Sequence, residues 1–389
     1  MPDAHAKLSA SSADRWIHCP GSIKLSEQAP PKGDTIYTME GTDAHILADL
    51  RVHSIVLGEK LKRKETAFIK GSAYYTEEMS DTANVYANYI QDLFQTAGKG
   101  AELMTEQRLD MTRWIPDGFG TADCCILGND ILYVCDFKYG KGVPVNAIDN
   151  PQIRLYGLGA IDLFDGLYDF SKVSLNIIQP RLGSISCENL SVQDLLKWGD
   201  EVVKPQAEKA MAGSDELAAG DWCRFCPCSP ICREQAKVRT EIAKYDFADE
   251  SLMTPAEITE VLKIADPCIK WLNAVKEYAL ARALAGETFD GWKVVEGRST
   301  RQYADELLVK QALNAAGYDD ALIYERKMYG LTAMTKIVGK KTMTSLEDMG
   351  LIIKPEGKPV LVPETDKRDA LDIDRIKKAQ TDFMEFYEF

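Results

Sequence analysis

The chain has 389 residues, of which 45% are hydrophobic and 27% are charged, a composition that is ordinary for a globular protein. No stretch approaches the roughly 20 apolar residues of a membrane-spanning helix, and the first residues lack an apolar signal core, so we expect a cytoplasmic protein that does not act at a membrane. The net charge of −14 argues against a simple nucleic-acid coat protein, because phosphate binding needs clustered Lys and Arg, but it leaves a nucleic-acid enzyme open.

Helical spacing of apolar residues dominates the first hundred positions. A short helix is predicted within residues 9–27, closed by Cys19 and Pro20, and two amphipathic helices are predicted over residues 41–57 and 81–94. The basic run at residues 60–64 is interpreted as a solvated loop.

From residue 102 the chain changes to short β-branched and apolar runs that are bounded by turn residues. A helix is predicted at residues 150–164, and another at 191–212 with Ser191 as its N-cap. This order predicts an α/β fold, a mixed sheet with helices on its faces. The runs predict four strands, at residues 102–110, 119–127, 131–137 and 172–179.

Acidic and basic side chains stand on or next to two neighbouring predicted strands. Asp136 and Lys138 share a face because side chains alternate along a strand, and Asp123 lies on the preceding strand about 4.8 Å away. Hydrolysis of a phosphodiester needs an activated water and a neutralised phosphate, which Mg²⁺ or Mn²⁺ held by carboxylates supplies. The alternative for Asp136 and Lys138 is a salt bridge on an exposed strand, but the apolar residues before them favour an internal strand, where such a pair is costly.

Three further polar residues fit the same site. Gln152 and Tyr156 are spaced i, i+4 on the next helix and share a face, as substrate-contacting residues or as a partly buried polar pair. His45 is either a structural histidine or a metal ligand, and an imidazole ligand shifts the preference toward Mn²⁺.

The sequence contains ten cysteines, and four of them have the spacing of metal ligands. Cys223, Cys226 and Cys232 follow the pattern C-x2-C-x5-C, and Cys19 is the candidate fourth ligand because it also precedes a proline. Zinc and an iron–sulfur cluster both remain open, and the additional Cys228 leaves the ligand set unsettled. The other cysteines are predicted to be core residues: Cys124, Cys125, Cys135, Cys187 and Cys268.

The last third of the chain carries no catalytic motif. We expect a domain boundary near residue 240, with residues 1–240 forming one domain and 241–389 a mostly helical accessory domain in which Pro255 opens a long helix. Basic and aromatic residues interleave at 324–329, which suits either an exposed loop or stacking with a single strand.

These motifs together resemble the PD-(D/E)XK nuclease superfamily and, within it, RecB-type nucleases with an iron–sulfur cluster, such as the CRISPR-adaptation exonucleases and the AddB nuclease domain. The resemblance spans roughly residues 10–235. It implies a restriction-endonuclease-like sheet, with His45, Asp123, Asp136 and the Phe137 carbonyl as metal ligands, Lys138 as the catalytic lysine and Gln152 with Tyr156 as the Gln-x-x-x-Tyr motif. It also implies a [4Fe–4S] cluster on Cys19, Cys223, Cys226 and Cys232, with structural zinc as the alternative.

The whole chain also resembles an uncharacterised phage and prophage protein family. Together the two resemblances imply a Mg²⁺- or Mn²⁺-dependent DNA exonuclease that acts in phage replication or recombination inside a bacterial host cell. The implied partners are single-stranded DNA or resected duplex ends. A phage annealing or single-strand-binding protein is a further candidate partner, and the resemblance is compatible with an oligomer. The alternatives are a catalytically silent nucleic-acid-binding or recombination-assembly protein and a zinc-stabilised structural protein.

Overall fold

The computed structural model describes residues 6–29, 35–240, 254–295, 306–316, 331–349 and 351–352. The chain forms two compact units, Met1–Val295 and Glu296–Phe389. The domain boundary predicted near residue 240 falls at the edge of the undescribed stretch 241–253. Helix α10 (Pro255–Leu284), which follows that stretch, belongs to the first unit.

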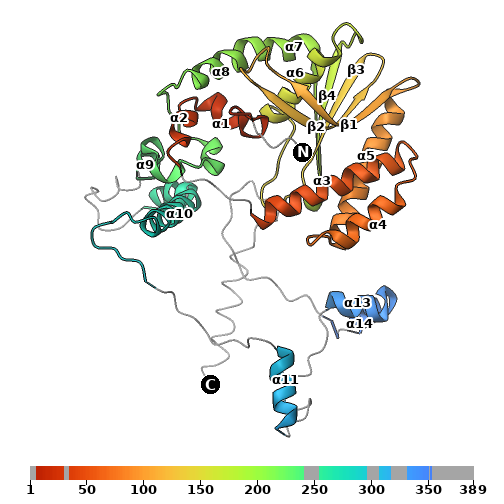
Figure 1. Cartoon of the computed structure of the whole chain (residues 1–389), viewed down its shortest axis with the longest axis vertical. Coiled ribbons are helices and arrows are strands. Elements are labelled where there is room, and N and C mark those ends of the chain that lie inside the picture. The colour runs from red at the N-terminus through yellow and green to blue at the C-terminus, as the bar shows by residue number, and fades with distance from the viewer. Residues whose placement is uncertain are drawn as a thin grey trace, which may run out of the picture. The chain divides into compact units, whose positions relative to one another are not determined.

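The first unit is built on a five-stranded mixed sheet in which the strands lie in chain order (Figure 1). Only the β3–β4 pair is parallel. Parallel neighbours need a crossover, and helix α6 (Pro151–Phe164) provides it. The prediction of a mixed sheet flanked by helices is confirmed. The strands are β1 (Glu102–Asp110), β2 (Phe119–Leu127), β3 (Ile131–Phe137), β4 (Lys172–Gln179) and β5 (Ser184–Ser191).

One face of the sheet is covered by α6 together with α7 (Val192–Trp198), α8 (Lys204–Met211) and the N-terminal α1 (Ala13–His18). The short helix α2 (Ser22–Ser26) packs on α8. The core here includes the fully buried Trp16, Trp114 and Leu158. Burial of such large apolar side chains is the main stabilising contribution to this layer.

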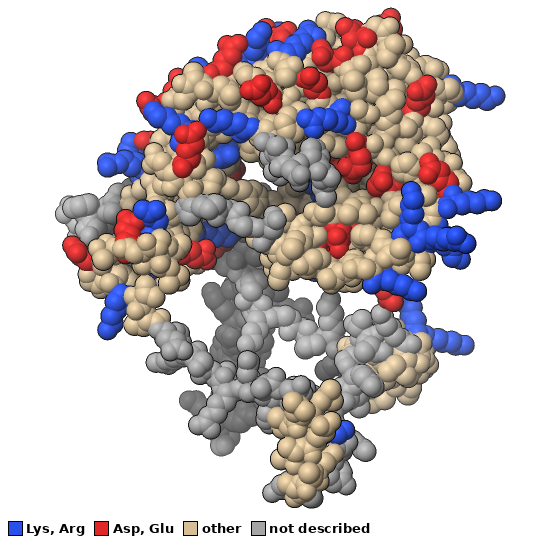
Figure 2. All heavy atoms as spheres, in the orientation of Figure 1, with Lys and Arg blue, Asp and Glu red and all other residues tan. Residues whose placement is uncertain are grey.

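The opposite face is covered by α3 (Ile36–Ile55) and α5 (Glu77–Ala97), which pack against each other and bury Leu47, Tyr86 and Phe137. Helix α4 (Lys62–Gly71) lies on α3 and buries none of its residues. The basic run at 60–64 is predicted to be a solvated loop, but from Lys62 onward it forms the first turn of α4. In Figure 2, Lys and Arg side chains gather over this corner of the visible face.

Side-chain caps explain where several helices begin. Asn150 accepts hydrogen bonds from the amides of Gln152 and Ile153, with Pro151 at the first turn, so α6 starts directly after the β3 loop. Ser191 accepts a hydrogen bond from the Asp194 amide, as predicted. Thr254 and Glu257 form a reciprocal capping pair at the start of α10.

Two predicted helices are interrupted. The helix expected over residues 191–212 contains a π-helical turn at Gly199–Val203 between α7 and α8. Pro205 has no amide hydrogen and cannot complete an ordinary helical turn, which accounts for the widened turn before it. The helix expected within 9–27 is split into α1 and α2 around Pro20 for the same reason.

The cysteine-rich segment forms two 3₁₀ turns, η4 (Asp221–Phe225) and η5 (Ser229–Ile231), followed by α9 (Arg233–Thr240). Both η5 and α9 contact α10 within the first unit. In the second unit, the described helices are α11 (Glu306–Ala315), α13 (Leu331–Val338) and α14 (Lys340–Asp348). The interleaved residues at 324–329 lie outside the described residues. Among the helices that the structure describes, none is long and apolar enough to span a bilayer.

Candidate active site and four-cysteine set

A histidine and two carboxylates from three different elements converge beside the sheet. His45 of α3, Glu106 of β1 and Asp123 of β2 each offer a ligand atom, and these atoms lie within 4.8 Å of one another. His45 Nδ1 is 3.2 Å from Asp123 Oδ1. The other oxygen of Asp123, Oδ2, accepts a hydrogen bond of 2.7 Å from the Phe137 amide.

The strands come apart at the level of this group. Thr105 pairs with Cys124 and Gln107 with Ala122, so Glu106 lies opposite Asp123, yet these two residues are missing from the ladder. Glu106 has a φ of 47°, in the left-handed region that costs a non-glycine residue about 1–3 kcal/mol. Because of this local distortion, the side chains of Glu106 and Asp123 need not follow the alternation of faces along a regular strand.

A second group of polar residues lies next to Asp123 and is linked by hydrogen bonds. Asp136 is 3% exposed, and its Oδ2 lies 2.9 Å from Lys138 Nζ. Gln152 accepts a hydrogen bond of 2.9 Å from Lys138 and points its own amide at Asp136 Oδ1, 3.3 Å away. The same amide lies 3.2 Å from the Tyr156 hydroxyl, so one glutamine connects the acid, the lysine and the tyrosine.

The electrostatics of the two carboxylates differ. Burial would raise the pKa of Asp123, but the charge and hydrogen bond of His45 and the Phe137 amide lower it. Burial would lower the pKa of His45, but the charge and hydrogen bond of Asp123, with the charge of Asp136, raise it to about 9. Burial raises the pKa of Asp136, although Lys138 opposes the shift. Burial and the nearby Asp123 raise the pKa of Glu106.

The four-cysteine set, Cys19 with Cys223, Cys226 and Cys232, joins the start of the sheet-bearing region to its end. Cys19 is buried, and its sulfur accepts a hydrogen bond from the Ala218 amide at 3.4 Å. Burial raises the pKa of Cys19, and the charges of Cys226 and Cys232 raise it further, which brings these thiols into one electrostatic neighbourhood. His18 stacks on Trp222 with 4.4 Å between ring centroids.

Among the residues that the structure describes, no three cysteine sulfurs lie within 4.8 Å of one another. Four thiolates are a ligand set that serves both a tetrahedral zinc ion and an iron–sulfur cluster.

Cys228 is fully buried beside the set and affects one of its members. A hydrogen bond from the Cys228 thiol lowers the pKa of Cys226 to about 6, with the Cys228 amide and Arg15 adding to it against the effect of burial. Of the predicted core cysteines, Cys187 is exposed, because it lies on the unpredicted edge strand β5. The others, Cys124, Cys125, Cys135 and Cys268, are buried.

A family pattern described as "Protein of unknown function (DUF2800)" matches residues 5–369. The chain belongs to the DUF2800 family. A solved structure, described as "Crystal structure of SSO0001", is similar at 18% sequence identity, covers 56% of the DUF2800 chain and 95% of its own, and has a TM-score of 0.24. A TM-score at that level supports no structural argument.

In this DUF2800 chain the predicted site residues divide into two adjoining groups. His45 and Asp123 lie together with the Phe137 backbone, whereas Asp136 lies with Lys138, Gln152 and Tyr156 and is not one of the three ligand atoms within 4.8 Å. Sequence reasoning missed Glu106. Aligning the hairpin β1–β2 around the turn at 111–118 would have placed Glu106 opposite Asp123, which is the signal that could have found it.

Proposed function

We propose that this chain is a metal-dependent DNA exonuclease of the RecB type, with a PD-(D/E)XK-like core, that acts in phage replication or recombination. The observation that carries the proposal is the hydrogen-bonded group of Asp136, Lys138 and Gln152 beside Asp123. A buried carboxylate beside a partly buried ammonium is costly to keep without a role, and a third polar residue, Gln152, contacts both members of this pair. The five-stranded mixed sheet is compatible with the proposed fold.

The residues fit a divalent cation. Asp136 Oδ2 is buried and accepts no hydrogen bond of acceptable geometry, although Lys138 is its ion-pair neighbour, so it has capacity left for a cation. Two more carboxylates and an imidazole stand beside it. The amide and carbonyl of one strand residue point to the same side, so the Phe137 carbonyl faces the edge that Asp123 occupies. Oxygen ligands suit Mg²⁺ or Mn²⁺, and the imidazole favours Mn²⁺.

Each side chain has a proposed role. A divalent cation held by Asp123, Asp136, His45 and the Phe137 carbonyl would lower the pKa of water and neutralise the phosphate. Lys138 stabilises charge on the scissile phosphate and orients the attacking water. Gln152 fixes the direction of the Lys138 ammonium, and Tyr156 steadies Gln152 and contacts the strand.

The four-cysteine set is proposed to hold a [4Fe–4S] cluster, with zinc as the alternative. Four thiolates are the usual ligand set of such a cluster. Its role is structural, because Cys19 and the segment 223–232 are far apart in sequence and both contribute ligands. The proposed partners are single-stranded DNA or resected duplex ends, and a phage annealing or single-strand-binding protein.

The test is digestion of end-labelled single- and double-stranded DNA with Mn²⁺ or Mg²⁺ by the full chain. We expect Asp136→Asn and Lys138→Met to lower the rate roughly a hundredfold or more, while Asp81→Asn, at an exposed acid on α5, leaves it unchanged. Equal DNA loss in all four proteins would reject the assignment. Tight DNA binding without cleavage by the wild type would favour the catalytically silent alternative.

A further inference from the structure

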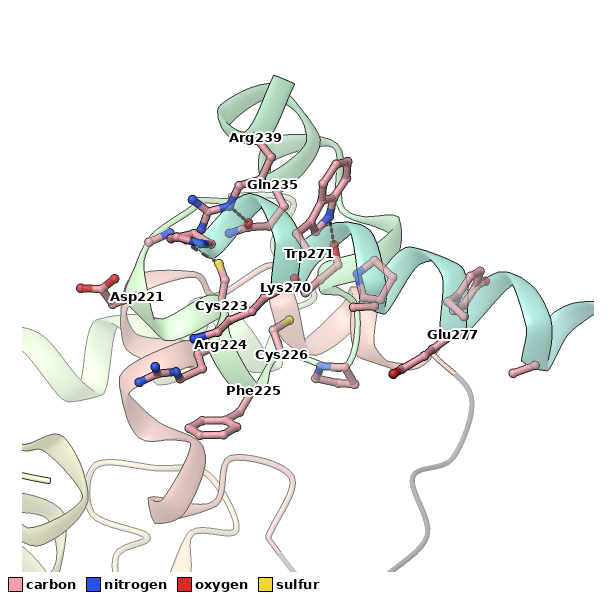
Figure 3. Close-up of a pocket in the computed structure, with 18 residues that line it drawn as sticks. Asp221, Cys223, Arg224, Phe225, Cys226, Gln235, Arg239, Lys270, Trp271 and Glu277 are labelled. Atoms are coloured by element: carbon pink, nitrogen blue, oxygen red, sulfur yellow. Dashed lines mark hydrogen bonds between the residues drawn. The ribbon is translucent and has the colours of Figure 1, made fainter. Parts of the chain in front are cut away.

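A pocket lies between the cysteine-rich turns and helix α10, away from the candidate active site (Figure 3). Its volume is about 770 Å³, within the range of about 300–1,000 Å³ that is usual for ligand sites. Cys223 and Cys226 open onto one side of it, and a stripe of α10 from Lys270 to Ala281 lines the other. That stripe is about 16 Å long, so the pocket extends well beyond a group held by the thiols.

The α10 wall has the shape of an open groove. The small residues Ala274 and Ala281 recur at a spacing of seven, with Trp271 and Tyr278 at the same spacing beside them. Alanines leave room where larger side chains would fill it. Trp271 is fixed by a hydrogen bond of 3.0 Å from its indole nitrogen to the Ser229 carbonyl, which also holds α10 against η5.

Cations are concentrated at the cysteine end of the pocket. Arg224 of η4 and Lys270 of α10 are exposed, and neither has an ion-pair partner among the described residues. Figure 3 shows Lys270 reaching from α10 toward η4. Two acids also line the pocket but lie apart from this pair of cations: Glu277 is about two turns, or 10 Å, further along α10, and Asp221 points away from that helix in Figure 3.

One observation indicates a ligand and not merely charge balance for the thiols. Phe225 is 71% exposed at the pocket, although a large aromatic side chain at that level of exposure gains little from the fold. An exposed aromatic face at a pocket wall is instead available to stack on a planar group.

We propose that this pocket binds single-stranded DNA, with phosphates on Arg224 and Lys270 and bases stacked on Phe225 and the aromatic residues of α10. Aromatic faces beside a cationic track are the chemistry of single-strand binding, because every base offers a π face and every nucleotide a phosphate. Bases of a duplex are stacked on each other and cannot use these faces. The inference rests on the proposed nuclease function, since it names the strand that the enzyme holds.

The test is fluorescence anisotropy with a labelled oligothymidine, using the full chain in the Asp136→Asn background so that DNA is not cut. We expect Arg224→Glu with Lys270→Glu to weaken binding at least tenfold and to reduce the slope of log affinity against log salt by about 1.4. Phe225→Ala weakens binding at least fivefold, and Phe225→Tyr restores it. The matched control, Arg233→Glu with Lys276→Glu, makes the same charge change at exposed residues outside the pocket and stays within twofold of the background.

An equal loss in the control, or competition by duplex DNA as strong as by single strands, would overturn the inference. DNA digestion by the chain with its wild-type active site tests the nuclease proposal separately. Cleavage with unaffected binding in the pocket variants would remove this inference alone, whereas pocket-dependent binding without any Mn²⁺-dependent cleavage would remove the nuclease proposal.

Discussion

The Asp123 carboxylate in the middle of β2 and the Phe137 amide at the end of β3 are joined by a hydrogen bond of 2.7 Å. The pairing of β2 with β3 ends at Cys124 and Cys135. The Phe137 amide lies beyond that point, and the Asp123 carboxylate provides its acceptor. It leaves the second oxygen of Asp123 directed at His45.

Replacing Asp123 with Asn should separate these two tasks. The amide oxygen of Asn can still accept from Phe137, so we expect stability to change little, but the lost charge should weaken Mn²⁺ binding at least tenfold. Asp123→Ala removes the acceptor as well and should cost about 1–3 kcal/mol in the free energy of unfolding. Urea denaturation and Mn²⁺ titration calorimetry measure the two effects. Wild-type Mn²⁺ affinity in Asp123→Asn would contradict the ligand assignment.

Glu106 should lower the stability of the fold and strengthen the binding of metal. Because its φ of 47° strains any residue except glycine, we expect Glu106→Gly to raise the free energy of unfolding by about 1 kcal/mol while weakening Mn²⁺ binding. Glu106→Gln keeps the strain and loses the charge, so it should weaken Mn²⁺ binding without stabilising the fold. If both variants bind Mn²⁺ like the wild type, Glu106 is not a ligand.

Gly120 controls the position of Tyr156. A Cβ at residue 120 would lie 2.8 Å from Tyr156 Cε1 and 3.2 Å from Met111 Cε. We expect Gly120→Ala to push the tyrosine ring away from Gln152, to cost about 1–3 kcal/mol and to slow DNA cleavage. Gly140→Ala is the matched control near the site, since a Cβ there meets nothing within 4 Å. Thermal unfolding and the cleavage rate of both variants provide the comparison.

Arg181 should stabilise the fold in a pH-dependent way. Its guanidinium is 8% exposed, lies 2.8 Å from Glu78 and packs on the ring of Tyr139. The hydrogen bond from Arg181 lowers the pKa of Glu78 from its ordinary 4.5, so this contribution is present above pH 4.5 and is lost as the pH falls through the lowered value.

We therefore expect Arg181→Met to cost about 1 kcal/mol at neutral pH, a modest value because Glu78 is half-exposed. The difference from wild type should shrink as the pH falls below 4.5 in urea denaturation. Arg181→Met in a Glu78→Gln, Glu40→Gln background should show no such pH dependence, since Glu40 is the second acid beside Arg181, at 3.6 Å. A difference that grows on acidification would contradict the assignment.

The four-cysteine set should lose its iron when one proposed ligand is replaced. We expect protein purified without oxygen to contain iron and acid-labile sulfide, Cys19→Ser and Cys232→Ser to contain neither, and Cys228→Ser to retain both. Cys125→Ser, a buried core position, is the control. Zinc in place of iron in the wild type would select the zinc alternative, and loss of iron only in Cys228→Ser would change the ligand set.

Strands β2, β3 and β4 could be predicted with their bounds because each is largely apolar and has turn residues at its ends. Strand β1 is mostly polar, and its bounds could be predicted from the glycines before it and the turn residues 111–118 after it. Strand β5 could not, since it is an edge strand whose side chains are mostly polar and of which only Glu188 is buried. Helix α4 has no fully buried residue, and only Phe68 packs against the core from it, so its sequence offers little apolar periodicity to detect. Helix α3 begins at Ile36 and not near residue 41, because Thr35 provides the cap.

For the candidate site, the pairing of Asp136 with Lys138 and of Gln152 with Tyr156 follows from the two-residue and four-residue periods of strand and helix. Such periods are local, so sequence reasoning reaches them. The position of Glu106 depends on a distorted strand and on the register of a hairpin, neither of which has a local signature. The pocket beside α10 forms because α10 packs on the cysteine-rich turns. That contact joins segments that are far apart in the sequence, so no local pattern predicts it.

The amide of Gly21 donates to the Glu216 carbonyl at 2.9 Å, and any side chain at Gly21 would meet that carbonyl at 2.6 Å. The segment that carries Cys19 is therefore completed by residues translated much later. A ribosome must release residue 225 before α1 acquires its final neighbours on α8 and η4. Chains stalled before that point would present the Trp16 surface to chaperones and proteases, so the N-terminal segment reaches its final packing only after more than 200 further residues have been made.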